Sequence, residues 1–236
     1  MPFQALEPQP DRYLLQDRAV FYAPSLSVLH EIRKLQKDRP SQTSLLLAVD
    51  AAQLPGSRRE VEGLRQVYGR SQVQVYSGAV ADQDLIRKEA PNYQLVHLAA
   101  HGVFQDRSPM NSYLVLAKAG KPEAGVLEAR EMMDLNLRAD MVVLSGCETG
   151  RGNSEGSEGF IGMSWALFVA GSPSTVASQW KVESEATTQL MLGFHRNLKR
   201  STKARALQQA ALEVMKNPDY RHPFYWSGFV LMGQGF

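Results

Sequence analysis

The sequence predicts an α/β fold, in which a mainly parallel β-sheet carries helices on both of its faces. Short apolar segments alternate along the chain with segments whose apolar residues recur at helical spacing. Most of the apolar segments are continuous, which is typical of strands that are covered on both sides. The length of 236 residues, with 44% hydrophobic and 21% charged residues, suits one large domain or two small ones.

The first elements follow a proline-bearing start that is expected to be irregular. Residues 19–23 are apolar and predict a strand that ends at Pro24. Ser25 or Ser27 can cap the helix that follows, in which leucine and isoleucine recur at a spacing of three residues. Residues 45–49 then predict an uninterrupted apolar strand.

A second helix is expected to begin near residue 57. Ser57 and Glu60 have the spacing of a capping box, in which each side chain satisfies a backbone N–H of the first turn. A short strand at 73–76 and a polar helix at 82–89 come next. The apolar run 95–100 predicts a buried strand near the middle of the sheet.

The middle of the chain predicts a strand at 113–116 and a helix at 127–135. A helix at 160–170 follows a glycine-rich linker over 150–159, which we expect to be mobile. Because this helix is apolar on nearly every face, we expect it to be buried, with Trp165 and Phe168 in its core.

The last part of the chain repeats the alternation. A strand is expected at 174–178, two helices at 184–198 and 202–216, and a final strand at 227–232. Such alternation calls for right-handed connections between parallel strands.

The residues that could most readily take part in catalysis follow two apolar runs. Cys147, the only cysteine in the chain, comes directly after the run 141–146, and His101 and Gly102 follow 95–100 in the same manner. Open parallel sheets bind ligands beyond the carboxyl ends of their strands. A thiol and an imidazole there suggest a cysteine nucleophile with a histidine base. The glycine-containing turns can point backbone N–H groups at a substrate oxyanion.

Other interpretations of these residues compete with this hypothesis. A lone cysteine is more often an inert buried thiol, and His97 is expected to lie in the core or behind the site. Arg151 follows the cysteine too soon for a phosphatase loop. A hydrolase elbow is loosely permitted, although it expects its histidine after the nucleophile. One cysteine and scattered histidines give no zinc-ligand spacing, so neither a metal nor a cofactor is expected.

Composition limits the partners and the cellular compartment that the sequence suggests. A net charge of +2 is too small to argue for nucleic acid or a membrane surface, and the basic residues between 196 and 205 are interpreted as a solvated face. One cysteine forms no internal disulfide, which favours a reducing, cytoplasmic compartment. The first residues lack the features of a signal peptide, and no apolar run is long enough to span a bilayer.

Five motifs together resemble the CHAT domain family, which is related to caspases and separases and is usually fused to tetratricopeptide repeats. They are His-Leu-Ala-Ala-His-Gly at 97–102, Val-Val-Leu-Ser-Gly-Cys-Glu-Thr-Gly at 142–150, Ser-Glu-Gly-Phe-Ile-Gly at 157–162, Val-Ala-Ser-Gln-Trp-Lys-Val at 176–182, and His-Pro-Phe-Tyr-Trp at 222–226. The motifs occur in the family's order across nearly the whole chain.

The resemblance implies a caspase-like three-layer sandwich over residues 1–236 and a cysteine endopeptidase that acts on a protein or peptide. It implies that His101 is the family's histidine, that Cys147 is the nucleophile, and that the backbone amides of Gly102 and Cys147 form the oxyanion hole. A regulatory protein or a tetratricopeptide-repeat region is the partner it suggests. A catalytically silent interaction domain of the same fold is the alternative.

The chain departs from the family pattern in three places. It has Ser145-Gly146-Cys147 where Ser-Ala-Cys is usual. Glu183 and Glu185 stand where the family often has paired aspartates, and with Gln179 and Trp180 they are our candidates for the substrate pocket. Residues 2–6 resemble a motif that normally follows an earlier segment, so we expect the chain to lack the family's N-terminal part. Substrate selection is expected in the loops 103–111, 151–158 and 179–185.

Overall fold

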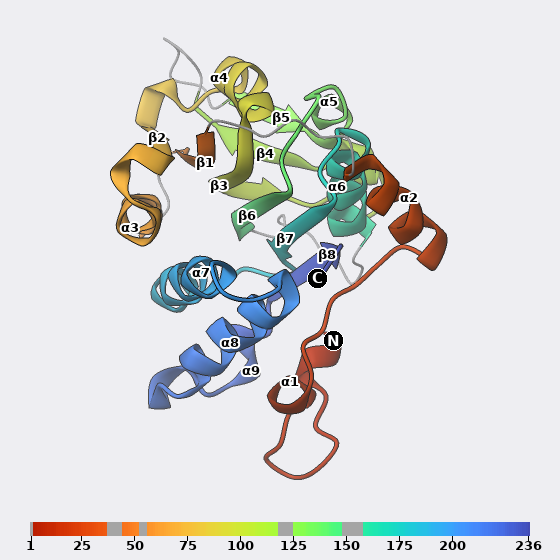
Figure 1. The fold of residues 1–236 in the computed structure, drawn as a ribbon, viewed down its shortest axis with the longest axis vertical. Helices are drawn as coiled ribbons and strands as arrows, with labels where there is room; N and C mark the ends of the chain where they lie inside the picture. Colours follow the sequence, from red (N-terminus) through yellow and green to blue (C-terminus); the bar gives the residue numbers. More distant parts are fainter. Residues whose placement is uncertain (1, 37–43, 52–55, 118–124, 148–157) are drawn as a thin grey trace.

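The protein is described by a computed structural model that covers residues 2–36, 44–51, 56–117, 125–147 and 158–236. Within these residues, eight strands form one sheet in the order β2-β1-β3-β6-β7-β8, and β4 and β5 extend it beside β3 (Figure 1). The strands are β1 (Ser44–Asp50), β2 (Val73–Ser77), β3 (Tyr93–Val103), β4 (Tyr113–Leu116), β5 (Gly125–Glu128), β6 (Met141–Cys147), β7 (Ser174–Ser178) and β8 (Phe229–Gly233).

The sheet is mainly parallel, with antiparallel pairing at β8 and at the β4–β5 hairpin. Strands β2, β1, β3, β6 and β7 run parallel to one another, whereas β8 runs antiparallel to β7. Strand β4 pairs in the antiparallel sense with the end of β3, and β5 pairs with β4. The carboxyl ends of five neighbouring strands therefore lie at one edge of the sheet, and the prediction of a mainly parallel sheet is confirmed.

Helices lie on both faces of this sheet (Figure 1). The α-helices are α1 (Leu14–Asp17), α2 (Leu26–Gln36), α3 (Ser57–Tyr68), α4 (Gln83–Glu89), α5 (Ala129–Met132), α6 (Glu158–Val169), α7 (Ser184–Leu198), α8 (Lys203–Met215) and α9 (Pro223–Trp226). Short 3₁₀ helices are η1 (Phe3–Ala5), η2 (Arg70–Gln72), η3 (Gly78–Val80), η4 (Ala90–Asn92), η5 (Pro109–Asn111) and η6 (Pro218–Tyr220). None of the helices in the described residues combines the length and apolar character needed to cross a membrane.

Two hydrophobic cores flank the sheet and give the fold its three layers. One core packs α4, α5 and α6 against the sheet through residues such as Ile86, Met132 and Leu167. The other packs α3, α7 and α8 through residues such as Leu64 and Phe194. Alternate residues of β1, β3, β6, β7 and β8 enter opposite cores, because successive side chains of a strand point to opposite faces.

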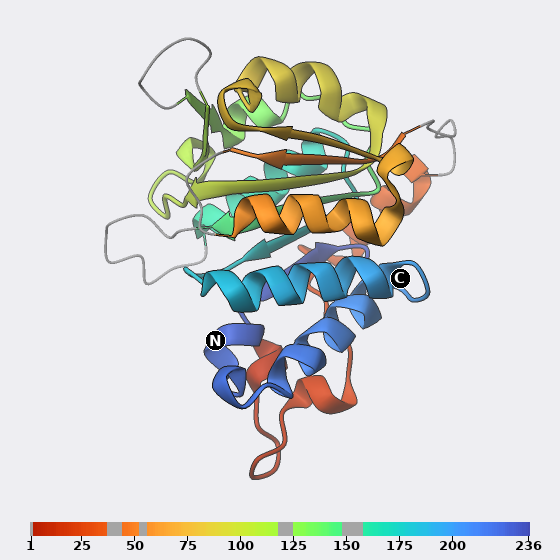
Figure 2. The ribbon, with the colours of Figure 1, turned by 90° about the vertical axis from the view of Figure 1, so that its left-hand side faces the viewer.

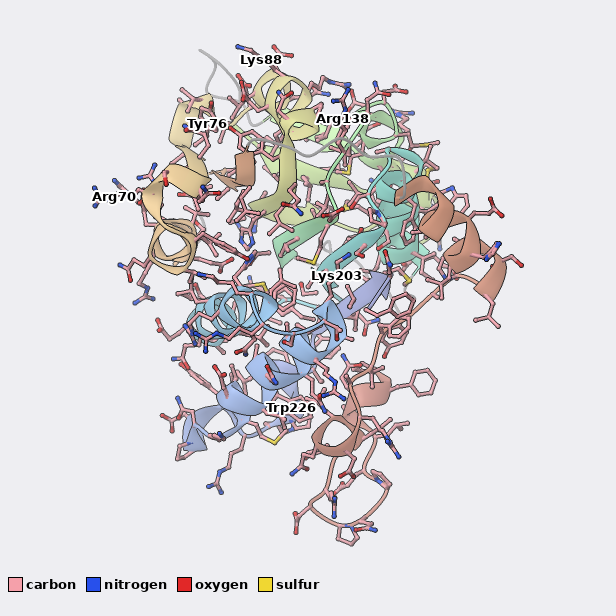
Figure 3. The ribbon with its side chains drawn as sticks, in the orientation of Figure 1. Arg70, Tyr76, Lys88, Arg138, Lys203 and Trp226 are labelled. Carbon is pink, nitrogen blue, oxygen red and sulfur yellow. The ribbon has the colours of Figure 1, made fainter. Side chains whose placement is uncertain are left out.

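The N-terminal segment lies along the outer edge of β8. Residues 19–23 were expected to form a strand, but only Tyr22 pairs, since its N–H donates to Leu231 O at 2.8 Å and its carbonyl accepts from Gly233 N at 2.7 Å. Trp226, labelled in Figure 3, packs edge-on against the Tyr13 ring, with 5.0 Å between the ring centres. The segment thus covers part of an otherwise open strand edge.

The helix expected at 127–135 is mostly wrong. Residues 125–128 form β5, whose Leu127 pairs with Leu114 of β4, and only Ala129–Met132 is α-helical. Because Leu127 is fully buried in the hairpin, cross-strand packing overrides the helical spacing that the sequence shows.

The prediction that the whole apolar helix is buried is also wrong. In α6, Ile161, Trp165 and Val169 are 42%, 44% and 48% exposed, whereas Met163 and Leu167 are buried. Residues four apart share one side of a helix, and the sheet covers only the opposite side. The expected core position of Trp165 is therefore corrected to an exposed one.

The expected capping box at the start of α3 does not form. The N-cap is Gly56, and Ser57 Oγ donates instead to Asp50 Oδ1 at 2.6 Å. The Glu60 carboxylate lies 2.7 Å from His97 Nε2. Ser57 and Glu60 are both buried, so they bind polar partners beneath the helix. They leave the first turn of α3 uncapped by side chains.

Candidate active site

The two strands that carry the candidate catalytic residues are neighbours. Strands β3 and β6 pair in parallel, with Leu95 opposite Met141 and Gly102 opposite Cys147. The backbones of His101 and Cys147 therefore lie at the same end of the sheet, as the hypothesis of a shared site requires. The side chain of Cys147 is outside the part of the chain that the structure describes, so the dyad itself remains a prediction.

An irregularity in the pairing falls at the histidine. Ala99 is opposite Ser145, but Gly102 is opposite Cys147, so β3 advances three residues while β6 advances two. One extra residue in this interval is the signature of a β-bulge, which bends a strand and redirects a side chain. Beyond the bulge, His101 also pairs with Val115 of β4. The half-buried His101 is therefore held between two strands.

The glycine before the cysteine has a backbone conformation that explains its identity. Gly146 has a φ of 96°, in the region that residues with a side chain rarely adopt. An alanine, which the family usually has here, would be strained by this backbone. Glycine is therefore the favoured residue for the backbone conformation that precedes Cys147.

The loop that follows His101 is fixed against the start of α6. The backbone N–H of Gly159 donates to Asp106 Oδ1 at 3.1 Å, and Gln105 N donates to Ser112 Oγ at 3.0 Å. A Cβ atom at Gly162 would lie only 2.4 Å from Pro109 Cβ. Glycine at 162 is thus required by the close approach of helix and loop. Of the three expected selection loops, 103–111 is held by these contacts, and 151–157 lies outside the described residues.

The third loop leaves the same edge of the sheet. Leu144 of β6 is opposite Ala177 of β7, and Trp180 follows the last residue of β7, Ser178, by two positions at the carboxyl edge of the sheet. Trp180 Nε1 donates to Phe224 O at 3.1 Å, and the two rings stack with 6.4 Å between their centres. Two of the motifs quoted above, at 176–182 and 222–226, therefore meet at this pair.

The other candidate pocket residues have structural partners. Gln179 N donates to Gly228 O at 2.9 Å. Glu183 caps α7, because its carboxylate accepts from Glu185 N at 3.0 Å and from Ala186 N at 2.7 Å. Glu185 forms an ion pair with Arg59, and this pair lines a hollow of about 300 Å³ between α3, α7 and α8. A pocket role for either glutamate would have to coexist with these contacts.

A further carboxylate at this edge was not among the residues singled out from the sequence. Asp50 ends β1 beside Ala99 of β3, and it is 5% exposed. The rule that identified His101 and Cys147, a reactive side chain at the end of an apolar run, also applies to Asp50 after 45–49. Close to it, the starts of α3 and α7 meet, since a Cβ at Gly56 would lie 2.7 Å from Ser184 Oγ.

Metal ligands do not gather in this region. Among the residues that the structure describes, no group of three or more histidine, cysteine, aspartate or glutamate side chains is arranged to hold a metal ion.

The comparisons with sequences agree with the motifs. The model of the CHAT domain matches residues 1–234. The chain is 28% identical over 109 residues to tetratricopeptide repeat protein 28 of Mus musculus, and 29% identical over 109 residues to that of Homo sapiens. Each match covers 46% of this chain and 4% of the relative, so the chain spans a small part of the length of these curated relatives.

Solved structures resemble the fold at low sequence identity. The separase–securin complex of Saccharomyces cerevisiae matches with a TM-score of 0.62 and 13% identity, over 92% of this chain and 14% of that one. A structure described as a protease matches with a TM-score of 0.60 and 10% sequence identity, over 88% of this chain and 51% of that one. The Arg-specific cysteine proteinase gingipain R matches with a TM-score of 0.54 and 12% sequence identity, over 89% of this chain and 51% of that one. The caspase-like fold expected from the resemblance is thereby confirmed.

Proposed function

The chain belongs to the CHAT domain family, and from this premise we propose that it is a cysteine endopeptidase that uses Cys147 and His101. In this reaction, the Cys147 thiolate attacks the scissile carbonyl carbon, and the imidazolium of His101 gives its proton to the leaving amine. Water, activated by His101, then hydrolyses the acyl-enzyme. A nearby imidazolium favours the thiolate, which is the reactive form of cysteine.

The observation that carries the proposal is the pairing of Gly102 with Cys147. It brings the residue after the histidine opposite the cysteine on adjacent strands, which lie about 4.8 Å apart. A dyad needs only about 3 Å between the sulfur and an imidazole nitrogen in the working complex, and free enzymes are often looser. The bulge at the histidine supplies a means of directing its side chain toward that gap.

The same pairing supports an oxyanion hole. We assign this role to the backbone amides of Gly102 and Cys147, because two N–H groups on one small concavity can stabilise the developing negative charge. Gly102 is buried and carries no side chain that would obstruct a substrate carbonyl.

Substrate selection is assigned to the edge that holds Gln179, Trp180, Glu183 and Glu185, with Asp50 nearby. Trp180 is half-buried and rests on Phe224, so its exposed part can form one wall of a pocket. Three carboxylates around the starts of α3 and α7 would favour lysine or arginine at the cleaved bond.

The proposal includes control by a protein partner or by a tetratricopeptide-repeat region. The relatives named above are called tetratricopeptide repeat proteins, and they extend far beyond the segment that matches this chain. A cytoplasmic location is part of the same proposal, because a single free thiol nucleophile suits a reducing compartment.

The deciding experiment is labelling with a peptidyl electrophile that carries arginine next to the reactive group. Intact mass measurement should show one adduct, at Cys147, in the wild-type chain and none in Cys147→Ala. In His101→Ala, labelling should be much slower. Free iodoacetamide serves as a control, because it reacts with any accessible thiol without peptide recognition. A Cys147 that reacts with iodoacetamide but ignores the peptidyl reagent, even with candidate partners added, would favour the silent interaction domain.

A further inference from the structure

A chain of four polar side chains runs beneath the helices, on the face of the sheet covered by α3 and α7. His97 Nε2 lies 2.7 Å from Glu60 Oε1, and His97 Nδ1 lies 3.2 Å from His195 Nε2. His195 Nδ1 lies 3.0 Å from the Tyr68 hydroxyl. Three contacts of hydrogen-bond length thus join Glu60 to Tyr68.

These four hydrogen-bonded side chains connect three elements of the fold. Glu60 and Tyr68 stand on α3, His97 on β3 and His195 on α7, and Figure 2 shows α3 and α7 side by side on one face of the sheet. Glu60 is 2% exposed, and both histidines are fully buried. Nothing in the reaction proposed above uses these groups, and buried ionisable residues need hydrogen bonds to be tolerated.

The protonation of two members is fixed by their surroundings. Burial, and then the neighbouring His97, lower the pKa of His195 well below its ordinary value. Burial raises the pKa of Tyr68. His195 is therefore neutral, with one N–H and one acceptor nitrogen, and Tyr68 keeps its proton.

With Glu60 as an ionised carboxylate, these constraints allow two patterns in which every contact is a hydrogen bond. In the first, both histidines are neutral: Tyr68 donates to His195 Nδ1, His195 Nε2 donates to His97 Nδ1, and His97 Nε2 donates to Glu60. In the second, His97 carries an added proton and donates from both nitrogens. His195 then accepts at Nε2 and donates from Nδ1 to the Tyr68 oxygen.

We propose that Glu60, His97, His195 and Tyr68 form a buried proton relay, which takes up one proton at His97 and keeps all three hydrogen bonds by switching the tautomer of His195. The proton enters at His97 because only this imidazole contacts the Glu60 carboxylate. A second proton would place two imidazolium ions in contact, and the hydrogen bond between the histidines would be lost.

The groups around the relay fit this assignment. Lys199, just after α7, donates to Val67 O at 2.9 Å, and its Nζ lies 5.8 Å from the centre of the Tyr68 ring. Asp50 on β1 accepts a hydrogen bond from Ser57. Strand β6 and helix α8 contribute apolar side chains to this face. Glu60 is thus the carboxylate in contact with an imidazole of the relay.

The relay has a structural consequence that is independent of peptidase activity. It holds α3 and α7 to β3, the strand that leads to His101, and α7 begins at Ser184, within the stretch 179–185. One proton leaves this clamp intact, whereas a second one releases α7 from the strand. The fold is therefore sensitive to the second protonation rather than to the first.

Imidazole ¹⁵N shifts of the full chain, measured from about pH 8 to about pH 5, distinguish the two tautomers and the charged form. We expect His97 to become doubly protonated. Over the same interval, His195 should stay neutral and change from the Nε2–H to the Nδ1–H tautomer. The proposal is overturned if His195 keeps its tautomer while His97 charges, if both become charged together, or if neither changes.

The variant Glu60→Gln sharpens the test, because its amide oxygen still accepts from His97 while the negative charge is lost. The tautomer switch should move to lower pH or disappear. The matched control is Glu62→Gln on the exposed side of α3, where Glu62 pairs with Arg65 at 3.0 Å, and it should leave the switch in place. A switch that is unchanged in Glu60→Gln contradicts the relay, and the wild-type spectra decide the matter if this variant fails to fold.

Discussion

Gly102 and Cys147 lie opposite each other across the β3–β6 pair, one step out of register with Ala99 and Ser145. The extra residue in β3 falls at the candidate base, and the positive φ of Gly146 falls directly before the candidate nucleophile. Two local departures from regular strand geometry thus fall together at the carboxyl end of the β3–β6 pair. Backbone irregularities of this kind are common at functional sites, where they direct side chains.

Removal of either member of the proposed dyad should abolish cleavage without unfolding the protein. Cys147→Ala and His101→Ala each take away a group that the reaction requires, and His101 is half-buried rather than part of the core. Cleavage of an arginine-containing peptide and the melting temperature measure the two effects. Substantial activity in either variant would show that the assignment of nucleophile and base is wrong.

Gly146→Ala tests whether the backbone before Cys147 matters to catalysis. A side chain at a φ of 96° should cost about 1–3 kcal/mol of unfolding free energy. We expect a loss of activity larger than this loss of stability explains, because the strain is relieved by moving Cys147.

Gly69→Ala is the matched control for this variant. Gly69 has a φ of 91°, and among the described residues a Cβ added there would meet no atom within 4 Å apart from its chain neighbours, so backbone strain is the main change. This variant should lose comparable stability in urea unfolding while its catalytic efficiency stays at the wild-type level. Equal activity losses in both variants would mean that Gly146 acts only through stability.

Trp180→Ala should raise KM for peptide substrates more than it lowers kcat. The substitution removes the indole, which stacks on Phe224 and donates to the Phe224 carbonyl, so the proposed pocket wall disappears. Trp180→Phe keeps an aromatic face and should retain most of the affinity. Steady-state kinetics separate these outcomes, and an unchanged KM in Trp180→Ala would place the pocket elsewhere.

The preference for a basic residue should depend on the negative charge that the carboxylates at the edge of the site present to a substrate. Glu185 is paired with Arg59, so Arg59→Ala should strengthen the preference for lysine or arginine, and Glu185→Ala should weaken it. A peptide library profile of each variant measures this effect. A profile without basic preference, or one that neither substitution changes, would remove Glu185 from the pocket.

Much of the fold follows from the sequence, because continuous apolar runs and helical spacing report local burial. The position of Cys147 beside the strand of His101 follows for the same reason, since carboxyl ends of parallel strands gather at one edge. Long-range partners are not encoded in such spacing. Ser57 and Glu60 have the pattern of a cap but bind Asp50 and His97, which come from strands β1 and β3.

The bulge at His101 and the exposure of Trp165 were equally hidden. Register depends on which residues of two strands pair, and a sequence pattern along one strand does not contain that information. The apolar side of α6 that bears Trp165 has the composition of a buried face, and only the packing of the helix on the sheet shows that this side is exposed.

The free energy of unfolding should fall as the pH decreases from neutral, because of His195. Burial and the neighbouring His97 lower its pKa in the folded state, whereas in the unfolded chain it binds a proton near pH ~6.5. A group whose pKa is lowered in the folded state contributes stability that is fully present at a pH above its pKa in the unfolded chain. This stability is lost as the pH falls below that pKa. One such histidine removes up to about 1.4 kcal/mol per pH unit.

Urea unfolding at a series of pH values, from about 7.5 to about 5.5, spans the unfolded-state transition of histidine. His195→Gln should be less stable at neutral pH, since a buried hydrogen bond is altered, but its stability should fall less steeply with acid. His30→Gln, at an exposed position on α2, should keep the wild-type slope. If His195→Gln and the wild type lose stability in parallel, the acid sensitivity arises from other groups.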